Sequence, residues 1–90
     1  MKTLKIFIEG TVQGVFFRKF IQANAEKLRL KGFVRNLDDG RVEIIVEGKD
    51  ENTNEMVRVC KRGPAHSEIK EVEVEEIKHH GFDDFNILKV

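Results

Sequence analysis

Polar and apolar residues alternate along the first ten positions of the chain. Leu4, Ile6 and Ile8 are apolar at every second position, which predicts a β-strand from about Thr3 to Glu9. The period then changes, because the next apolar residues recur three or four positions apart, as on one face of a helix. These residues are Phe17, Phe20, Ile21, Ala25 and Leu28. We expect this helix to begin near Phe17 and to end at Lys31-Gly32, a cation followed by glycine.

Two further apolar runs flank a turn sequence. The runs Phe33 to Leu37 and Arg41 to Glu47 are typical of strands, and Asp38-Asp39-Gly40 lies between them. Asp-Gly between alternating runs is the strongest short-range signal for a β-hairpin. We therefore expect these two strands to pair with each other.

A second helix is predicted after this hairpin. Asp50 is a candidate N-cap residue, and Gly63-Pro64 is a strong signal for the end of the helix. The residues that we expect to point inward are Met56, Val57 and Cys60.

The last third of the chain predicts two more strands. A long strand covers about Ser67 to Lys78, and its apolar phase slips between Ile69 and Val72 and again between Val74 and Ile77. We expect a bulge or a bend there. A final short strand is predicted from the apolar residues Phe82, Phe85, Ile87 and Leu88.

The element order is β-α-β-β-α-β with one more strand at the end. This order is typical of the α+β class and of the ferredoxin-like split β-α-β sandwich. We expect an antiparallel sheet with two helices on one face and an extra C-terminal strand. The first strand of such a sheet lies beside the third, and the second strand pairs with the third.

Composition limits the range of functions. The 90 residues are 40% hydrophobic, which is enough for one modest core, so we expect a single domain over residues 1–90. Sixteen basic and sixteen acidic residues balance, whereas non-specific nucleic-acid binding depends on excess positive charge. Cys60 is the single cysteine and can form no intramolecular disulfide, which favours a reducing compartment. No apolar run reaches membrane-spanning length, so we expect no membrane partner. We expect a cytoplasmic monomer, and the balanced charge disfavours a nucleic-acid partner.

The segment from Gly10 to Arg18 carries the strongest chemical signal. A glycine-bounded turn that leaves a strand and enters a helix leaves several backbone N–H groups without partners. These N–H groups and the positive end of the helix dipole together form an anion site. The guanidinium of Arg18, at the end of the loop, can hold two oxygens of a phosphate.

Asn36 is the second candidate for chemistry. It lies near the end of the second strand, just before the turn at Asp38-Asp39-Gly40. In a split β-α-β sheet this position can approach the mouth of the first loop.

Two segments resemble signatures of the acylphosphatase family. Gly10-Thr11-Val12-Gln13-Gly14-Val15-Phe16-Phe17-Arg18 is similar to the first signature, and Gly32 to Val42 is similar to the second. The likeness extends to Gly63-Pro64 and to the C-terminal end, so it covers nearly the whole chain. Phe33 stands where many members carry tryptophan, which changes packing but not the site.

The resemblance implies a function and a set of roles. The family hydrolyses acyl phosphates to a carboxylate and inorganic phosphate without a metal or other cofactor, and the phosphate product is also an inhibitor. Arg18 would bind the phosphate, and the Asn36 side chain would hold the attacking water. The backbone cradle for the phosphate would be formed by Gln13, Gly14, Val15, Phe16, Phe17 and Arg18.

This chemistry agrees with the residues present. Phosphoryl transfer asks a protein mainly for positioning and charge stabilisation. An acyl phosphate expels a carboxylate, a stable anion that needs no protonation, so the absence of an obvious general acid near either signature is no obstacle. The amide oxygen of Asn36 can accept a hydrogen bond from water and fix its direction.

Other functions remain open at this stage. The same fold carries RNA-recognition modules, and Lys31-Gly32-Phe33-Val34 resembles the start of an RNA-binding signature, although no interleaved aromatic pair follows. A non-catalytic anion-binding module is a further alternative. His79-His80 with Asp83 and Asp84 could suggest a metal site, but we favour a solvated turn, since their spacing does not support ligation.

Overall fold

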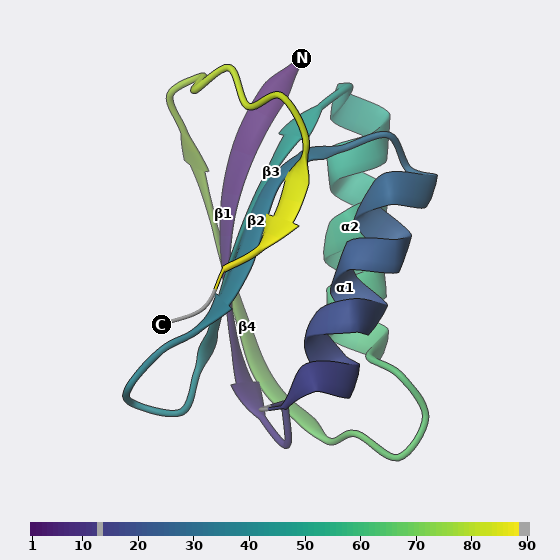
Figure 1. Cartoon of the computed structure of the whole chain (residues 1–90), viewed down its shortest axis with the longest axis vertical. Coiled ribbons are helices and arrows are strands. Elements are labelled where there is room, and N and C mark those ends of the chain that lie inside the picture. Colours follow the sequence, from purple (N-terminus) through teal and green to yellow (C-terminus); the bar gives the residue numbers. More distant parts are fainter. Residues whose placement is uncertain (13, 89–90) are drawn as a thin grey trace.

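The computed structural model describes residues 1–12 and 14–88. The elements follow the predicted order (Figure 1), and their bounds are β1 (Lys2–Gly10), α1 (Val15–Lys27), β2 (Lys31–Asn36), β3 (Val42–Gly48), α2 (Asp50–Arg62), β4 (Ile69–Ile77) and β5 (Phe85–Ile87). Both helices cover the same face of the sheet. The α+β, ferredoxin-like fold expected from the sequence is confirmed.

The strands lie in the order β4-β1-β3-β2-β5. The first four form antiparallel pairs, β1 with β3 and β4 and β2 with β3, as the split β-α-β arrangement requires. The extra strand β5 pairs with β2 in parallel, so the whole sheet is mixed rather than purely antiparallel. It reaches β2 because the segment 78–84 crosses from β4 to the far edge of the sheet (Figure 1).

The core lies between the helices and the sheet. Side chains alternate along each strand, so that Leu4, Ile6 and Ile8 of β1 face the helices and Lys5, Phe7 and Glu9 face away. We call the face of the sheet that points away from the helices the open face. The apolar side chains of the core are Leu4, Ile6, Ile8, Val12, Phe17, Ile21, Ala25, Leu30, Val34, Val42, Ile44, Val46, Met56, Val59, Cys60 and Phe85.

The prediction that Lys31-Gly32 ends α1 was wrong. The helix ends at Lys27, and Arg29 adopts a left-handed conformation (φ 58°), the role that glycine usually has there. The backbone N–H of Leu30 donates to the carbonyl oxygen of Ala25 at 2.8 Å, which completes the helix end. Gly32 instead lies inside β2, where a Cβ atom would come within 1.9 Å of the Ile45 carbonyl oxygen. A glycine is needed at this position because β2 and β3 approach closely, and the local sequence pattern does not reveal this requirement.

The prediction that Asp50 is the N-cap of the second helix was wrong by one position. The N-cap of α2 is Lys49, and Asp50 is the first helical residue, with no side-chain capping hydrogen bond. The carboxylates of Asp50 and Glu51 still lie in the first turn, where they interact favourably with the helix dipole. Met56 and Cys60 are buried as predicted, and Val57 is half-buried against the core.

The first phase slip in β4 is a bulge and the second is not. Gly10 pairs with Ile69 and Glu9 pairs with Glu71, so Lys70 is an extra residue in the ladder. The bulge keeps Ile69 on the core side of the sheet. Pairing is regular from Val74 to Ile77, and Ile77 therefore lies on the open face opposite Thr3.

Candidate active site

Residues 10–18 run from the last residue of β1 into the first turn of α1, and this segment is here called the cradle loop. Gly10 has φ 145°, and a Cβ atom there would lie 2.0 Å from the Glu68 carbonyl oxygen. The backbone N–H of Thr11 donates to that same oxygen at 2.8 Å. Val12 is fully buried and anchors the loop in the core. The start of the loop is therefore fixed by a backbone hydrogen bond at Thr11 and by the buried side chain of Val12.

Gly14 sets the conformation in which the loop meets the helix. It is the N-cap of α1, with φ 116° and ψ 166°, a region that is essentially restricted to glycine. Among the side chains of residues 1–12 and 14–88, none caps α1, and the first turn of the helix contains no acidic residue. A Cβ atom built on Gly14 would meet nothing within 4 Å, so the helix end faces open space. Uncapped first-turn N–H groups and the helix dipole favour an anion at this end.

Val15, Phe16 and Phe17 form the first turn of α1. Val15 is 46% and Phe16 is 87% exposed, whereas Phe17 is buried in the core. Intrahelical bonding begins with the N–H of Arg18, which donates to the Gly14 carbonyl oxygen at 3.4 Å. The N–H groups of the three residues before Arg18 come too early in the helix to have an intrahelical acceptor.

Arg18 is half-buried and folds back along α1. Its Nε donates to the Gly14 carbonyl oxygen at 3.3 Å. Among the residues that the structure describes, no hydrogen bond or ion pair engages its two Nη groups. The planar fork is therefore held near the helix N-terminus and available to an anion.

Asn36 lies at the same end of the molecule, on the helix side of the sheet. Asn36 and Ile8 both pair with Val42, one from each side of β3. Paired residues share a face, so the Asn36 side chain points toward the helices, about two strand spacings of 4.8 Å each from Ile8. The end of β1, the end of β2 and the start of α1 lie together at one end of the fold (Figure 1).

The amide oxygen of Asn36 has no hydrogen-bond partner among the described residues. Its Oδ1 is the one buried side-chain polar atom without a partner within residues 1–12 and 14–88. Buried polar atoms form hydrogen bonds in the great majority of cases, and an exception points to a functional role. No hydrogen bond or ion pair within the described ranges joins Asn36 directly to Arg18. Gln13, the remaining predicted cradle residue, lies outside the described residues.

A cavity of about 210 Å³ adjoins the cradle loop. Sequence reasoning missed it, because its far wall is the turn before β4, which only the fold brings next to the start of α1. Its lining residues are Thr11, Phe16, Phe17, Pro64, Ala65, His66 and Ser67.

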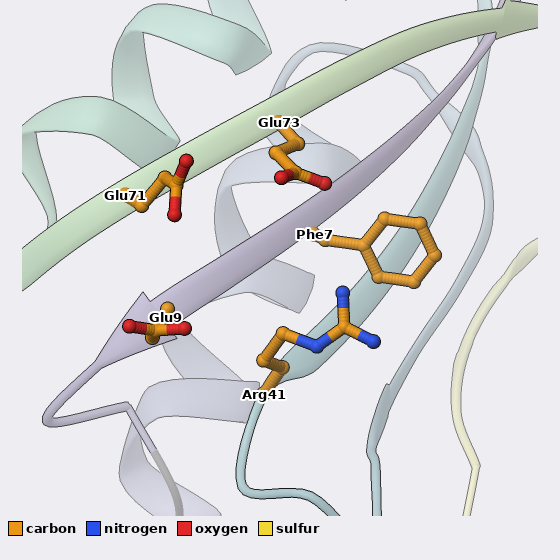
Figure 2. A pocket seen from close by; sticks show the side chains of 5 residues that line it. All are labelled: Phe7, Glu9, Arg41, Glu71 and Glu73. Atoms are coloured by element: carbon orange, nitrogen blue, oxygen red, sulfur yellow. The ribbon is translucent and has the colours of Figure 1, made fainter.

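A second cavity, of about 260 Å³, lies on the open face. Figure 2 shows the carboxylates of Glu9, Glu71 and Glu73 around it, with Arg41 beside the ring of Phe7. The Arg41 guanidinium lies 4.7 Å from the centre of that ring and also forms an ion pair with Asp39. Three carboxylates repel an anion, so this cavity is unsuited to an acyl phosphate.

Glu47 is the most perturbed carboxyl group in the described structure, and sequence reasoning did not identify it. Its carboxylate is buried on the open face and accepts hydrogen bonds from the Thr3 hydroxyl and the backbone N–H groups of residues 80–82. Burial alone would raise the pKa of Glu47, but these donors outweigh it and lower the pKa to about 2. The group fastens the segment 78–84 and lies at the opposite end of the sheet from Asn36.

The other candidate groups do not form reactive sites. Within the described ranges, no group of three or more His, Cys, Asp and Glu residues is arranged to hold a metal ion. Cys60 is fully buried, and burial raises the pKa of its thiol to about 12, so it is not a thiolate nucleophile at neutral pH. In the part of the chain that the structure describes, no helix is long and apolar enough to cross a membrane.

The chain is similar to known proteins over nearly its full length. The sequence profile of the Acylphosphatase family matches residues 4–87. An acylphosphatase of Bacillus licheniformis is 44% identical over 97% of this chain and 98% of its own length. One from Rubrobacter xylanophilus is 48% identical over 83% of this chain and 68% of its own length.

A solved structure agrees with this assignment. The crystal structure of acylphosphatase from Bacillus subtilis superposes with a TM-score of 0.93 at 39% identity, covering 98% of this chain and 99% of that one. This chain belongs to the acylphosphatase family, whose members are hydrolases of acyl phosphates.

Proposed function

We propose that this acylphosphatase holds the phosphate of its substrate in the cradle loop and attacks it with a water aimed by Asn36. The observation that carries the proposal is the N-terminus of α1, which no described side chain caps, with the Nε of Arg18 hydrogen-bonded back to the Gly14 carbonyl oxygen. Preorganised N–H donors and a guanidinium stabilise the charge on the phosphoryl oxygens without reorganising during the reaction. The cradle comprises Gln13, Gly14, Val15, Phe16, Phe17 and Arg18.

Asn36 orients the attacking water and does not act as a general base. Its unpartnered Oδ1 accepts a hydrogen bond from the attacking water. The water oxygen bonds to phosphorus in line with the leaving group, the P–O bond to the acyl oxygen breaks, and its electron pair leaves on the carboxylate. Both water protons stay on the phosphate product. No general acid is needed, because the carboxylate is a stable anion.

We also propose the domain organisation, oligomeric state and compartment of this protein. Residues 1–90 act as a single acylphosphatase-like domain, a cytoplasmic monomer that uses no metal or cofactor. Inorganic phosphate, as the product, occupies the same cradle and inhibits. A catalytically silent anion-binding or RNA-binding module of the same fold is the alternative, and the balanced charge disfavours RNA.

Hydrolysis of acetyl phosphate, with and without EDTA, tests the proposal. We expect turnover that the chelator does not change and that inorganic phosphate inhibits competitively. The Arg18→Ala variant should lose most of the activity, whereas Lys19→Ala, its exposed neighbour on the same helix, should retain it. Salt-dependent RNA binding without turnover would support the alternative instead.

A further inference from the structure

The cavity beside the cradle loop is lined largely by apolar residues and by no acidic residue. Four of its lining residues are apolar, namely Phe16, Phe17, Pro64 and Ala65. Phe16 is the most exposed large apolar side chain of the described residues, at 87%, although it lies next to a polar site. The Phe16 ring therefore offers apolar surface to a ligand at the edge of the cavity. None of the lining residues is acidic, in contrast to the cavity on the open face.

The wall opposite Phe16 is a well-fixed turn. The Ser67 hydroxyl donates to the Pro64 carbonyl oxygen at 2.7 Å, and the Ser67 N–H donates to the same oxygen at 3.3 Å. Gly63 leaves no room for a side chain, because a Cβ atom would come within 2.7 Å of the Ser67 hydroxyl. Since the Thr11 N–H bonds to the Glu68 carbonyl oxygen, this turn is also fastened to the cradle loop. Hydrogen bonds therefore hold the backbone of this turn against the backbone at the start of the cradle loop.

The sheet order places this cavity across the cradle from Asn36. β4 lies beside β1 on one side, and β3 and then β2 lie on the other. Residues 64–67 precede β4, and Asn36 ends β2, so they flank the end of β1 from opposite sides. In-line attack requires the water and the leaving group on opposite sides of phosphorus. If Asn36 holds the water, the acyl group points into the cavity.

We propose that this cavity is the acyl subsite, and that it selects acyl phosphates with an aromatic or branched apolar acyl group over small ones. The inference rests on the proposed function, because it takes its direction from the water at Asn36. The cavity has about 210 Å³, which is more than the roughly 150 Å³ that a benzene ring needs. Phe16 and Phe17 form the aromatic side of the subsite, and Pro64 and Ala65 form the other.

The test compares two substrates that share the phosphate and differ in the acyl group. We measure kcat/KM for benzoyl phosphate and for acetyl phosphate and take their ratio, which cancels any change in the cradle. Ala65→Trp fills the cavity from an exposed turn position, and Ala23→Trp, on the exposed side of α1 outside the cavity, is the matched control. Phe16→Ser removes the aromatic wall and provides a second variant if Ala65→Trp does not fold.

We expect the wild type to prefer benzoyl phosphate and both cavity variants to reduce the ratio about tenfold, the discrimination that a small apolar pocket contact supplies. The control should keep the wild-type ratio. An unchanged ratio in the folded cavity variants would overturn the acyl subsite while leaving the cradle chemistry intact. Failure of the wild type to hydrolyse either substrate would overturn the proposed function, and this inference with it.

Discussion

The Nε of Arg18 lies 3.3 Å from the carbonyl oxygen of Gly14, to which it donates a hydrogen bond. This bond turns the guanidinium back toward the first residues of α1 instead of letting it extend into solvent. It links the cation to the same glycine whose conformation opens the helix end. The two parts of the proposed phosphate site are therefore oriented by one local contact.

Arg18→Ala should lower kcat/KM for acetyl phosphate by about 100- to 1000-fold, the usual loss for one preorganised donor in a transition state. Arg18→Lys keeps the charge but loses the planar fork, so we expect an intermediate loss. Steady-state kinetics of both variants beside Lys19→Ala measures the effect. Activity of Arg18→Ala near that of Lys19→Ala would contradict the role.

Asn36→Ala should lower kcat by about 100-fold and leave the inhibition constant of inorganic phosphate within a factor of three. The reason is that Asn36 is assigned to the water and not to the phosphate. Because its Oδ1 has no partner in the described structure, the variant loses no hydrogen bond at that atom. Its free energy of unfolding should equal or exceed that of the wild type, as measured by urea unfolding. A loss of phosphate affinity would assign Asn36 to the substrate instead.

Gly14→Ala should damage activity through the backbone alone. Open space surrounds the added Cβ, but a non-glycine residue at φ 116° and ψ 166° costs about 1–3 kcal/mol and re-aims the neighbouring N–H groups. Gly81→Ala is the matched control, since Gly81 also has a positive φ (81°) and room for a Cβ, yet lies in the segment 78–84 at the other end of the fold. We expect kcat/KM to fall at least tenfold in Gly14→Ala only, in parallel assays of both folded variants. Equal activity in the two would refute a backbone cradle at Gly14.

Glu47 should make the fold sensitive to acid. Its pKa falls from 4.5 to about 2 on folding, so the carboxylate stabilises the folded state above about pH 5, and this stabilisation is lost as the pH falls toward 2. The contribution is roughly 3 kcal/mol at neutral pH. Glu47→Gln should therefore be less stable than the wild type at pH 7, by a margin that shrinks toward pH 3.

Urea unfolding at pH 7, 5, 4 and 3 measures that margin. Glu76→Gln, an exposed position on β4, serves as the charge-matched control and should differ little from the wild type at every pH. A margin for Glu47→Gln that stays constant across the series would show that the ionised carboxylate does not fasten the segment 78–84.

The order of elements was predictable because it depends on local periodicity and turn residues. The Asp38-Asp39-Gly40 hairpin and the helical spacing from Phe17 to Leu28 each determine an element without reference to the rest of the chain. Arg29 and Gly32 show where this fails. A glycine after a cation is typical of a helix end, yet Gly32 is needed for the approach of β2 to β3, and that need exists only in the paired sheet.

The sequence indicates which residues to propose for the candidate site, but it does not indicate which distant segments surround them. The cradle loop and Asn36 lie in contiguous segments, so their types and spacing are legible from the chain. The turn at residues 64–67 and the Glu47 contacts to residues 80–82 join positions far apart in sequence. Their partners follow from strand register and order, which the local pattern does not specify.

Phosphate binding in the cradle loop is tested most directly by titrating the ¹⁵N-labelled protein with inorganic phosphate and following the amide chemical shifts. A phosphate cradle at this position predicts saturable shifts in the backbone amides of Gly14, Val15, Phe16, Phe17 and Arg18, which are absent in Arg18→Ala. The amides of residues 80–82, fastened by Glu47, should stay unchanged. Shifts centred on Arg41 and the open face, with none at the start of α1, would contradict it.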